Sequence, residues 1–298
     1  MSFHRVNLVL LALLLIGVRS ELKAQVESDD VTNHFERTVF RWTGFEVPDY
    51  QESDFGIPFA TDRPDFTEAA STVGKDRVQL ETGYRFSRDN DTGSRVDSHA
   101  FAEQLWRIGI GREWLELRLG WNYFSERSGV PGQRDTVDGG DDLQLGFKIA
   151  LTEQVGWLPA MALIPQTFLP TGAESYSSGE VLPGLNWVYS WDIKEGVFFG
   201  GSTQINRVSD DVGEAYSEWA QSLTFGMDLN ERLGVYGEWY VLAPHAAPDE
   251  SDVDVEHYLN GGFTFMMHEE LQFDIRAGMG LNRAAEDLFV GTGLSRRW

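Results

Sequence analysis

The strongest constraint in the sequence is an alternation of apolar and polar residues with a period of two, clearest in LELRLGWNY at residues 115–123. Leu115, Leu117, Leu119, Trp121 and Tyr123 form the apolar set. Successive side chains of a β-strand point to opposite faces, so the pattern predicts a strand with one apolar and one polar face. A helix would scatter the same residues around its circumference. The apolar face therefore has to be covered by a protein core or by lipid.

The alternation recurs along the chain after Gly74. It predicts about twelve strands of roughly ten residues, the length that a tilted membrane-spanning strand needs. The predicted strands are residues 78–86, 100–110, 115–123, 143–152, 157–169, 185–193, 197–206, 219–229, 233–241, 259–267, 271–281 and 288–298.

The predicted connections alternate in length. Short turns follow the even-numbered strands, around Gly111, Gln154, Glu195, Asn230 and Glu269. Longer loops follow the odd-numbered strands at residues 90–98, 125–142, 171–181, 209–217 and 244–254, with a moderate one at 283–286. Outer-membrane barrels have short periplasmic turns and longer outer loops. The sequence therefore predicts an all-β, antiparallel, up-and-down transmembrane barrel whose apolar rows face outer-membrane lipid.

Two segments precede the predicted barrel of residues 75–298. Residues 1–24 read as a signal peptide, because a basic start precedes an apolar run too short to span a bilayer. Ala24 is a candidate cleavage position, although Leu22 fits a small-residue site poorly. Residues 25–74 are acidic, contain prolines and lack periodicity, which predicts an extended periplasmic arm outside the main fold.

Composition excludes several kinds of function. The formal net charge of −23 disfavours a nucleic-acid partner, because phosphate binding needs a basic surface. The absence of cysteine excludes disulfides and thiolate chemistry. A metal site at His245 with Asp249 and Glu250 is conceivable, but such an acidic loop is more often only solvated. We therefore expect no cofactor and no metal.

Aromatic residues gather near the ends of the predicted strands, as the interfacial girdles of a barrel require. The candidates are Trp114, Tyr123, Trp157, Phe168, Phe198, Trp219 and Tyr240. Trp298 has the parity of the apolar face and resembles the signal that barrel assembly machinery recognises, although Arg296 departs from the usual apolar residue two positions earlier.

If the apolar rows face lipid, the alternate positions line the lumen. The predicted lumen-lining residues are Glu81, Arg85, Glu103, Arg107, Glu116, Arg118, Lys148, Glu238, Asp274 and Arg276. Their signs balance, so they can pair across strands and narrow the water path. A barrel of about twelve strands lies between a filled interior and a wide channel, so we expect a narrow pore for small solutes.

A motif just before the first predicted strand resembles a known family. The chain reads FATDRPDFTE at residues 59–68, then VQLETGYRF, and later LIPQTFLPTG. Together these resemble the outer-membrane transporter family labelled "MetA-pathway of phenol degradation". The resemblance implies an outer-membrane location and passage of small solutes, including aromatic compounds, and brings no catalytic residue. The motif consists of Thr61, Asp62, Arg63, Pro64, Asp65, Phe66, Thr67 and Glu68.

Two interpretations of the motif stay open. It can enter the lumen as a plug, with Arg63 on a lumen carboxylate and Asp62 or Asp65 on an arginine. Alternatively, it is a structural turn that delivers the chain to the barrel wall.

Two rival functions also stay open. One is an outer-membrane hydrolase, although none of the six histidines lies in a recognisable motif with a serine and a carboxylate. The other is a barrel that serves structure or adhesion without transport.

Overall fold

The computed structural model describes residues 37–40, 57–91, 94–130, 132–210, 214–245, 247 and 253–298. All of them belong to the unit Glu36–Trp298. The predicted signal peptide, its cleavage position, and most of the predicted arm lie outside the described residues. Among the described residues there is no helix of the length and apolar character needed to cross a membrane.

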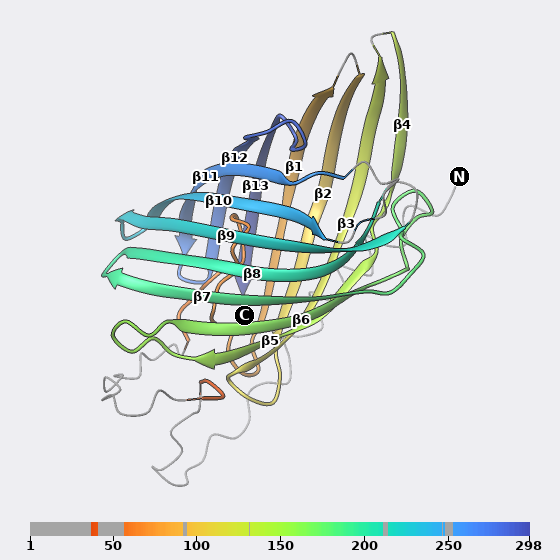
Figure 1. The fold of residues 1–298 in the computed structure, drawn as a ribbon. Helices are drawn as coiled ribbons and strands as arrows, with labels where there is room; N and C mark the ends of the chain where they lie inside the picture. The colour runs from red at the N-terminus through yellow and green to blue at the C-terminus, as the bar shows by residue number, and fades with distance from the viewer. Residues whose placement is uncertain are drawn as a thin grey trace, which may run out of the picture. The chain divides into compact units, whose positions relative to one another are not determined.

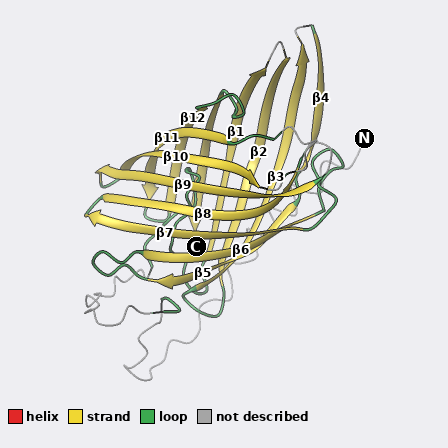
Figure 2. Ribbon diagram, viewed as in Figure 1, coloured by secondary structure: helices red, strands yellow, loops and turns green. Residues whose placement is uncertain are grey.

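The described chain folds into antiparallel strands whose hydrogen bonding closes on itself (Figures 1 and 2). Twelve strands form the ring in chain order, β1 pairs with both β2 and β13, and a thirteenth strand, β4, pairs only with β3. The strands are β1 (Val78–Asp91), β2 (Ser94–Gly109), β3 (Leu115–Val130), β4 (Gln133–Gly140), β5 (Leu143–Thr152), β6 (Ala160–Leu169), β7 (Leu182–Lys194), β8 (Val197–Ser209), β9 (Ala215–Asn230), β10 (Leu233–His245), β11 (Glu256–His268), β12 (Leu271–Gly280) and β13 (Leu288–Arg297). The predicted closed antiparallel barrel is confirmed.

The predicted apolar rows lie on the outside of this barrel. On β9, for example, Trp219, Leu223 and Phe225 are exposed, whereas the intervening Ser222 and Thr224 are buried. The same outward exposure of large apolar side chains recurs on β7, β11, β12 and β13. A soluble protein would not leave such a continuous apolar surface in water. The belt therefore matches a lipid-facing surface.

The outer ends of the first strands differ from the prediction. Residues 90–98 and 125–142, expected to be loops, are largely strand, because β1 to β3 run on for 14 to 16 residues and β4 pairs with the end of β3. The tips of β1 to β4 extend beyond the other strands (Figure 1). The sequence of β4, QRDTVDGG, has no apolar alternation to reveal it. Its strand character depends instead on backbone pairing with β3.

Some of the predicted girdle residues have inward parity. Tyr240 is buried and stacks on Phe66 and Tyr258, with ring centroids 4.5 Å and 4.7 Å away. Its parity on β10 is that of the inward-facing Glu238, whereas Trp239 and Val241 belong to the apolar row. Phe198 also has inward parity, that of the buried Ser202 on β8, and its ring lies against Gly226 on β9. Trp219 and Tyr123 are exposed as an outer girdle requires.

Residues 57–76, which we call the inner segment, pack against the barrel strands and then turn into β1. At this turn the chain passes very close to the end of β2: a Cβ on Gly109 would lie 1.7 Å from the carbonyl oxygen of Gly74. Gly74 itself has φ of +90°, a conformation that favours glycine. The backbone bonds from Asp76 N to Gly109 O and from Gly109 N to Arg77 O hold the crossing in place.

We predict that Gly109→Ala lowers the free energy of unfolding by about 1–3 kcal/mol, the usual cost of overpacking, since the added methyl group meets backbone that cannot rotate away. Guanidinium titration of the protein in detergent micelles measures this change. Gly237→Ala is the matched control, because Gly237 also lies within a strand and its Cβ would meet no atom within 4 Å. Equal stability of the two variants would contradict the prediction.

Candidate functional site

The inner segment makes polar contacts around the whole inside of the barrel. Its partners project from nine of the twelve ring strands, namely β1, β2, β3, β5, β7, β9, β10, β12 and β13. Side chains from strands on opposite sides of a closed ring can meet one segment only in the space that the ring encloses. The chain from Ile57 to Gly74 is therefore not an arm outside the main fold.

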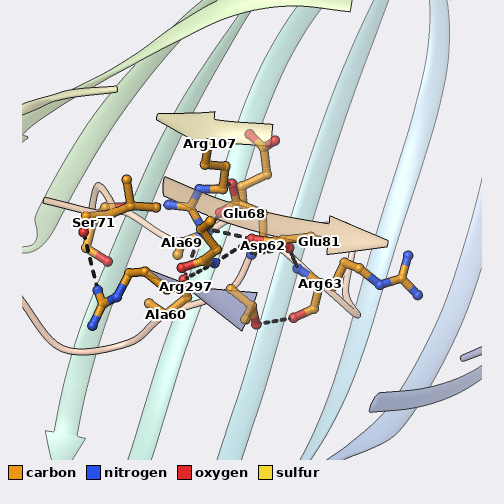
Figure 3. A network of polar contacts seen from close by, with 12 residues as sticks. Ala60, Asp62, Arg63, Glu68, Ala69, Ser71, Glu81, Arg107 and Arg297 are labelled. Carbon is orange, nitrogen blue, oxygen red and sulfur yellow. Dashed lines mark hydrogen bonds and ion pairs between the residues drawn. The ribbon is translucent and has the colours of Figure 1, made fainter. Parts of the chain in front are cut away.

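Asp62 is the centre of the densest part of this network (Figure 3). Its carboxylate accepts a hydrogen bond from Lys148 Nζ at 2.6 Å, pairs with Arg118, and lies 3.3 Å from Arg107 Nε. Its backbone N–H donates to both carboxylate oxygens of Glu81 at 3.0 Å. All five side chains are buried. One carboxylate thus compensates three buried cations from three different strands.

Arg63 is held on the opposite side of the same turn. Its guanidinium donates to Glu103 on β2 at 2.6 Å and to Asp274 on β12 at 3.3 Å. The space for it comes from Gly83 and Gly293, which are directly paired on β1 and β13. A Cβ on either glycine would lie within 2.5 Å of the guanidinium group. The two glycines therefore form a cradle that only residues without a side chain can provide.

The middle of the inner segment is clamped by one carboxylate of β10. Glu238 accepts hydrogen bonds from the backbone N–H groups of Phe66 and Thr67, each at 2.7 Å, and from the Thr67 hydroxyl at 2.7 Å. Asn260 donates a further bond to it at 2.7 Å. Thr67 also bonds Ser222 on β9 at 2.6 Å.

The last part of the inner segment, from Glu68 to Val73, contacts β7, β3 and β2. Glu68 accepts a hydrogen bond from Asn186 on β7 at 2.8 Å and pairs with Arg118. The carbonyl oxygen of Ser71 accepts from Arg107, and Val73 N donates to Glu116 at 2.9 Å. Arg107 and Glu116 are themselves paired at 2.8 Å, so the exit of the segment is built on an ion pair between β2 and β3.

The ten residues predicted to line the lumen are brought together by this arrangement. Nine of them contact the inner segment directly: Glu81, Glu103, Arg107, Glu116, Arg118, Lys148, Glu238, Asp274 and Arg276. The tenth, Arg85, pairs with Glu286 instead. Whether they line a passage for solutes stays a prediction at this point.

The network also contains buried residues that the charge pattern of the sequence does not single out, because most of them are uncharged. They have the inward parity of their strands and are Gln79, Asn186, Ser222, Asn260 and Arg297. Arg297 donates to the carbonyl oxygens of Pro58 and Val73, and so closes the two ends of the segment. Parity alone would have identified these residues. The cradle of Gly83 and Gly293 left no such signal, because it depends on strand register.

A cavity of about 760 Å³ lies beside the inner segment. Its lining includes the inner segment, the C-terminal parts of β1 and β10, the start of β11 and the connection between β12 and β13. Part of its wall is a row of rings, Phe66, Tyr240, Tyr258 and Phe289, which pack on one another. This space is large enough for a small solute.

The histidines of the described chain form no catalytic arrangement that we can identify. His99 bonds the Tyr84 hydroxyl at 2.7 Å, and His257 stacks on the outward-facing Trp239. Within the described ranges, no group of three or more His, Asp or Glu side chains is placed to hold a metal ion. Asp249 and Glu250, considered with His245 for a metal, lie outside the described residues.

Comparison with known proteins identifies relatives of this barrel. The model of the family described as "Putative MetA-pathway of phenol degradation" matches residues 61–298. No curated protein matches the chain by sequence. An outer membrane channel from Pseudomonas putida F1 has a similar structure, with a TM-score of 0.57 and 12% identity over 79% of this chain and 99% of that one. The translocator domain of the autotransporter NalP from Neisseria meningitidis gives a TM-score of 0.49 and 11% identity over 74% and 88%. The fold is that of an outer-membrane β-barrel, and the predicted outer-membrane location is confirmed.

We predict that Asp62→Ala lowers the free energy of unfolding by about 3–5 kcal/mol, the cost of breaking a buried ion pair, because Lys148, Arg107 and Arg118 lose a shared counter-charge. The change can be measured by denaturant titration in detergent micelles. Asp135→Ala provides the control, since Asp135 is exposed on β4 and forms no ion pair with a described residue. A loss no larger than that of the control would show that the three cations do not depend on Asp62.

Proposed function

The chain belongs to the family described as "Putative MetA-pathway of phenol degradation", and from this premise we propose that it is an outer-membrane channel for small solutes, restricted by its inner segment. The observation that carries the proposal is the circuit of contacts from residues 57–76 to nine strands of the ring. A chain segment that crosses the interior in this way narrows any path through the barrel. The ten charged wall residues line that path.

The manner in which the segment is held favours a plug over a turn that only delivers the chain to the wall. Residues 57–76 form no strand, and the contacts that fix them are side-chain hydrogen bonds and ion pairs. Water and solute can replace such contacts one at a time, whereas strand pairing would have to break cooperatively. A segment held in this way can shift while the wall stays closed.

The solute class follows from the cavity and the family. The ring row of Phe66, Tyr240, Tyr258 and Phe289 offers an apolar surface beside hydrogen-bonding groups, which suits a small molecule with an aromatic ring. The family description refers to phenol degradation, and the similar protein from Pseudomonas putida is named a channel. We therefore propose that small aromatic compounds are among the solutes of the channel.

The proposed contact with barrel assembly machinery concerns Trp298. Trp298 is 44% exposed, and its backbone exchanges hydrogen bonds with Val78, which closes the seam between β13 and β1. Arg296, the residue that departs from the usual signal, lies over its ring at 5.1 Å. Recognition of Trp298 by the machinery stays a prediction.

We expect Arg63→Ala to raise the mean single-channel conductance in planar lipid bilayers, because the segment loses its ties to Glu103 and Asp274. Gly293→Ala should do the same, since its methyl group displaces the guanidinium while Arg63 remains. Lys75→Ala is the control: Lys75 lies in the same segment, and its one ion pair within the described chain is with the neighbouring Asp76.

Unchanged conductance and gating in both variants would overturn the plug. Liposome swelling with the wild-type protein then tests the rival functions. A channel admits small sugars and small aromatic solutes, whereas a structural or adhesive barrel, or a hydrolase without a pore, leaves the swelling rate at that of protein-free liposomes.

A further inference from the structure

The charge of the cavity differs from that of the barrel wall. The ten wall residues carry five acids and five bases, so they balance. The cavity is lined by seven acids, Asp62, Asp65, Glu68, Glu81, Asp89, Glu256 and Glu286, and by three bases, Arg63, Arg85 and Arg276. A formal excess of four negative charges therefore faces the space beside the inner segment.

The excess is not distributed evenly along the path. Deep in the barrel, Asp62 is compensated by Lys148, Arg107 and Arg118, and Arg118 also pairs with Glu68. These ions are buried and paired with one another, whereas Asp65, another acid of the lining, forms no ion pair with a described residue.

The mouth of the cavity has a different balance. Asp89 is near the end of β1, Glu256 starts β11, and Glu286 lies between β12 and β13, so all three are on the side of the long connections. Arg85, a base of the same lining, pairs with Glu286, and its guanidinium lies 4.9 Å from the Phe289 ring centroid. Glu256 forms no ion pair with a described residue and instead accepts the Tyr258 hydroxyl at 2.5 Å.

A second observation indicates what such a mouth would accept. Asn260 lines the cavity and is 93% buried, since only 7% of it is exposed. Its amide nitrogen donates to Glu238, while its carbonyl oxygen has no hydrogen-bond partner among the described residues. An unpaired acceptor behind carboxylates favours a solute that brings N–H or O–H donors, or a hydrated cation, over an anion.

We infer that this mouth makes the channel select cations over anions, with Glu256 and Asp89 as the residues that determine the preference. The inference rests on the proposed channel function. Field lines from charges at the entrance of a cleft with low-dielectric walls are focused into it, so small cations accumulate and anions are excluded. Solutes that carry an amine or another positive group should pass more readily than carboxylates of similar size.

The test is the reversal potential of the full-length protein in a planar bilayer under a KCl gradient. The wild type should show a K⁺/Cl⁻ permeability ratio above one. Glu256→Gln, which keeps the volume and the acceptor for Tyr258, should move the ratio toward one, and Asp89→Asn should act in the same direction. Glu269→Gln should leave the ratio unchanged, because Glu269 is exposed in a short turn between β11 and β12 on the opposite side.

The outcomes separate the two claims. A conducting wild type that prefers Cl⁻, or a ratio that neither Glu256→Gln nor Asp89→Asn moves, overturns cation selection and leaves the channel standing. The complete absence of current overturns the channel and the selectivity with it. Heat-modifiable migration on gels confirms that each variant is folded before its reversal potential is compared.

Discussion

The cost of burying charge governs the interior of this barrel. Arg107, Arg118 and Lys148 are shielded from water by the wall on one side and the inner segment on the other. An uncompensated buried cation costs several kcal/mol, so each needs a carboxylate within contact distance. The neighbouring strands supply Glu81 and Glu116, and Asp62 supplies the third. The wall cations therefore hold the inner segment in place, and the acids of the segment in turn allow these cations to be buried.

The same condition bears on the displacement of the inner segment that the proposed plug requires. In a wall that faces lipid, every backbone N–H and C=O group must be hydrogen-bonded to a neighbouring strand, because unpaired groups cannot face hydrocarbon. The inner segment is under no such restriction, since water can solvate whatever it releases. In the displaced state that the proposed plug requires, the pair of Arg107 with Glu116 at 2.8 Å and the pair of Arg276 with Glu103 at 2.8 Å would remain, because both are formed between wall strands. These pairs would keep some of the wall charges compensated without the segment, whereas Lys148 would lose Asp62, its one ion-pair partner among the described residues, and would need water in its place.

The alternation within each strand predicted the barrel wall, whereas β4 and the contacts of the inner segment depend on residues far apart in the sequence. Alternation along each strand requires only neighbouring residues, so the strands and the inward parity of residues such as Lys148 and Glu238 could be read from the sequence. β4 could not, because QRDTVDGG is strand only through its pairing with β3. The glycine cradle of Arg63 could not be predicted either, because Gly83 and Gly293 become neighbours only through the register of β1 and β13, which lie some two hundred residues apart in the sequence. The sequence predicted an ion pair for Arg63 but offered no means to choose Glu103 and Asp274 as its partners.

The motif TDRPDFTE has a physical explanation in these terms. Thr61, Asp62, Arg63, Phe66, Thr67 and Glu68 each bond a side chain from the wall, and Pro64 offers its carbonyl oxygen to Arg276. The partners lie on strands spread from β1 to β12, so the loss of the side chain of Asp62, Arg63 or Glu68 leaves a specific wall residue without a partner. Pro64 and Phe66 bond the wall through backbone atoms, which a change of side chain does not remove. The family match covers residues 61–298, so it includes both the motif and the wall residues that bond it.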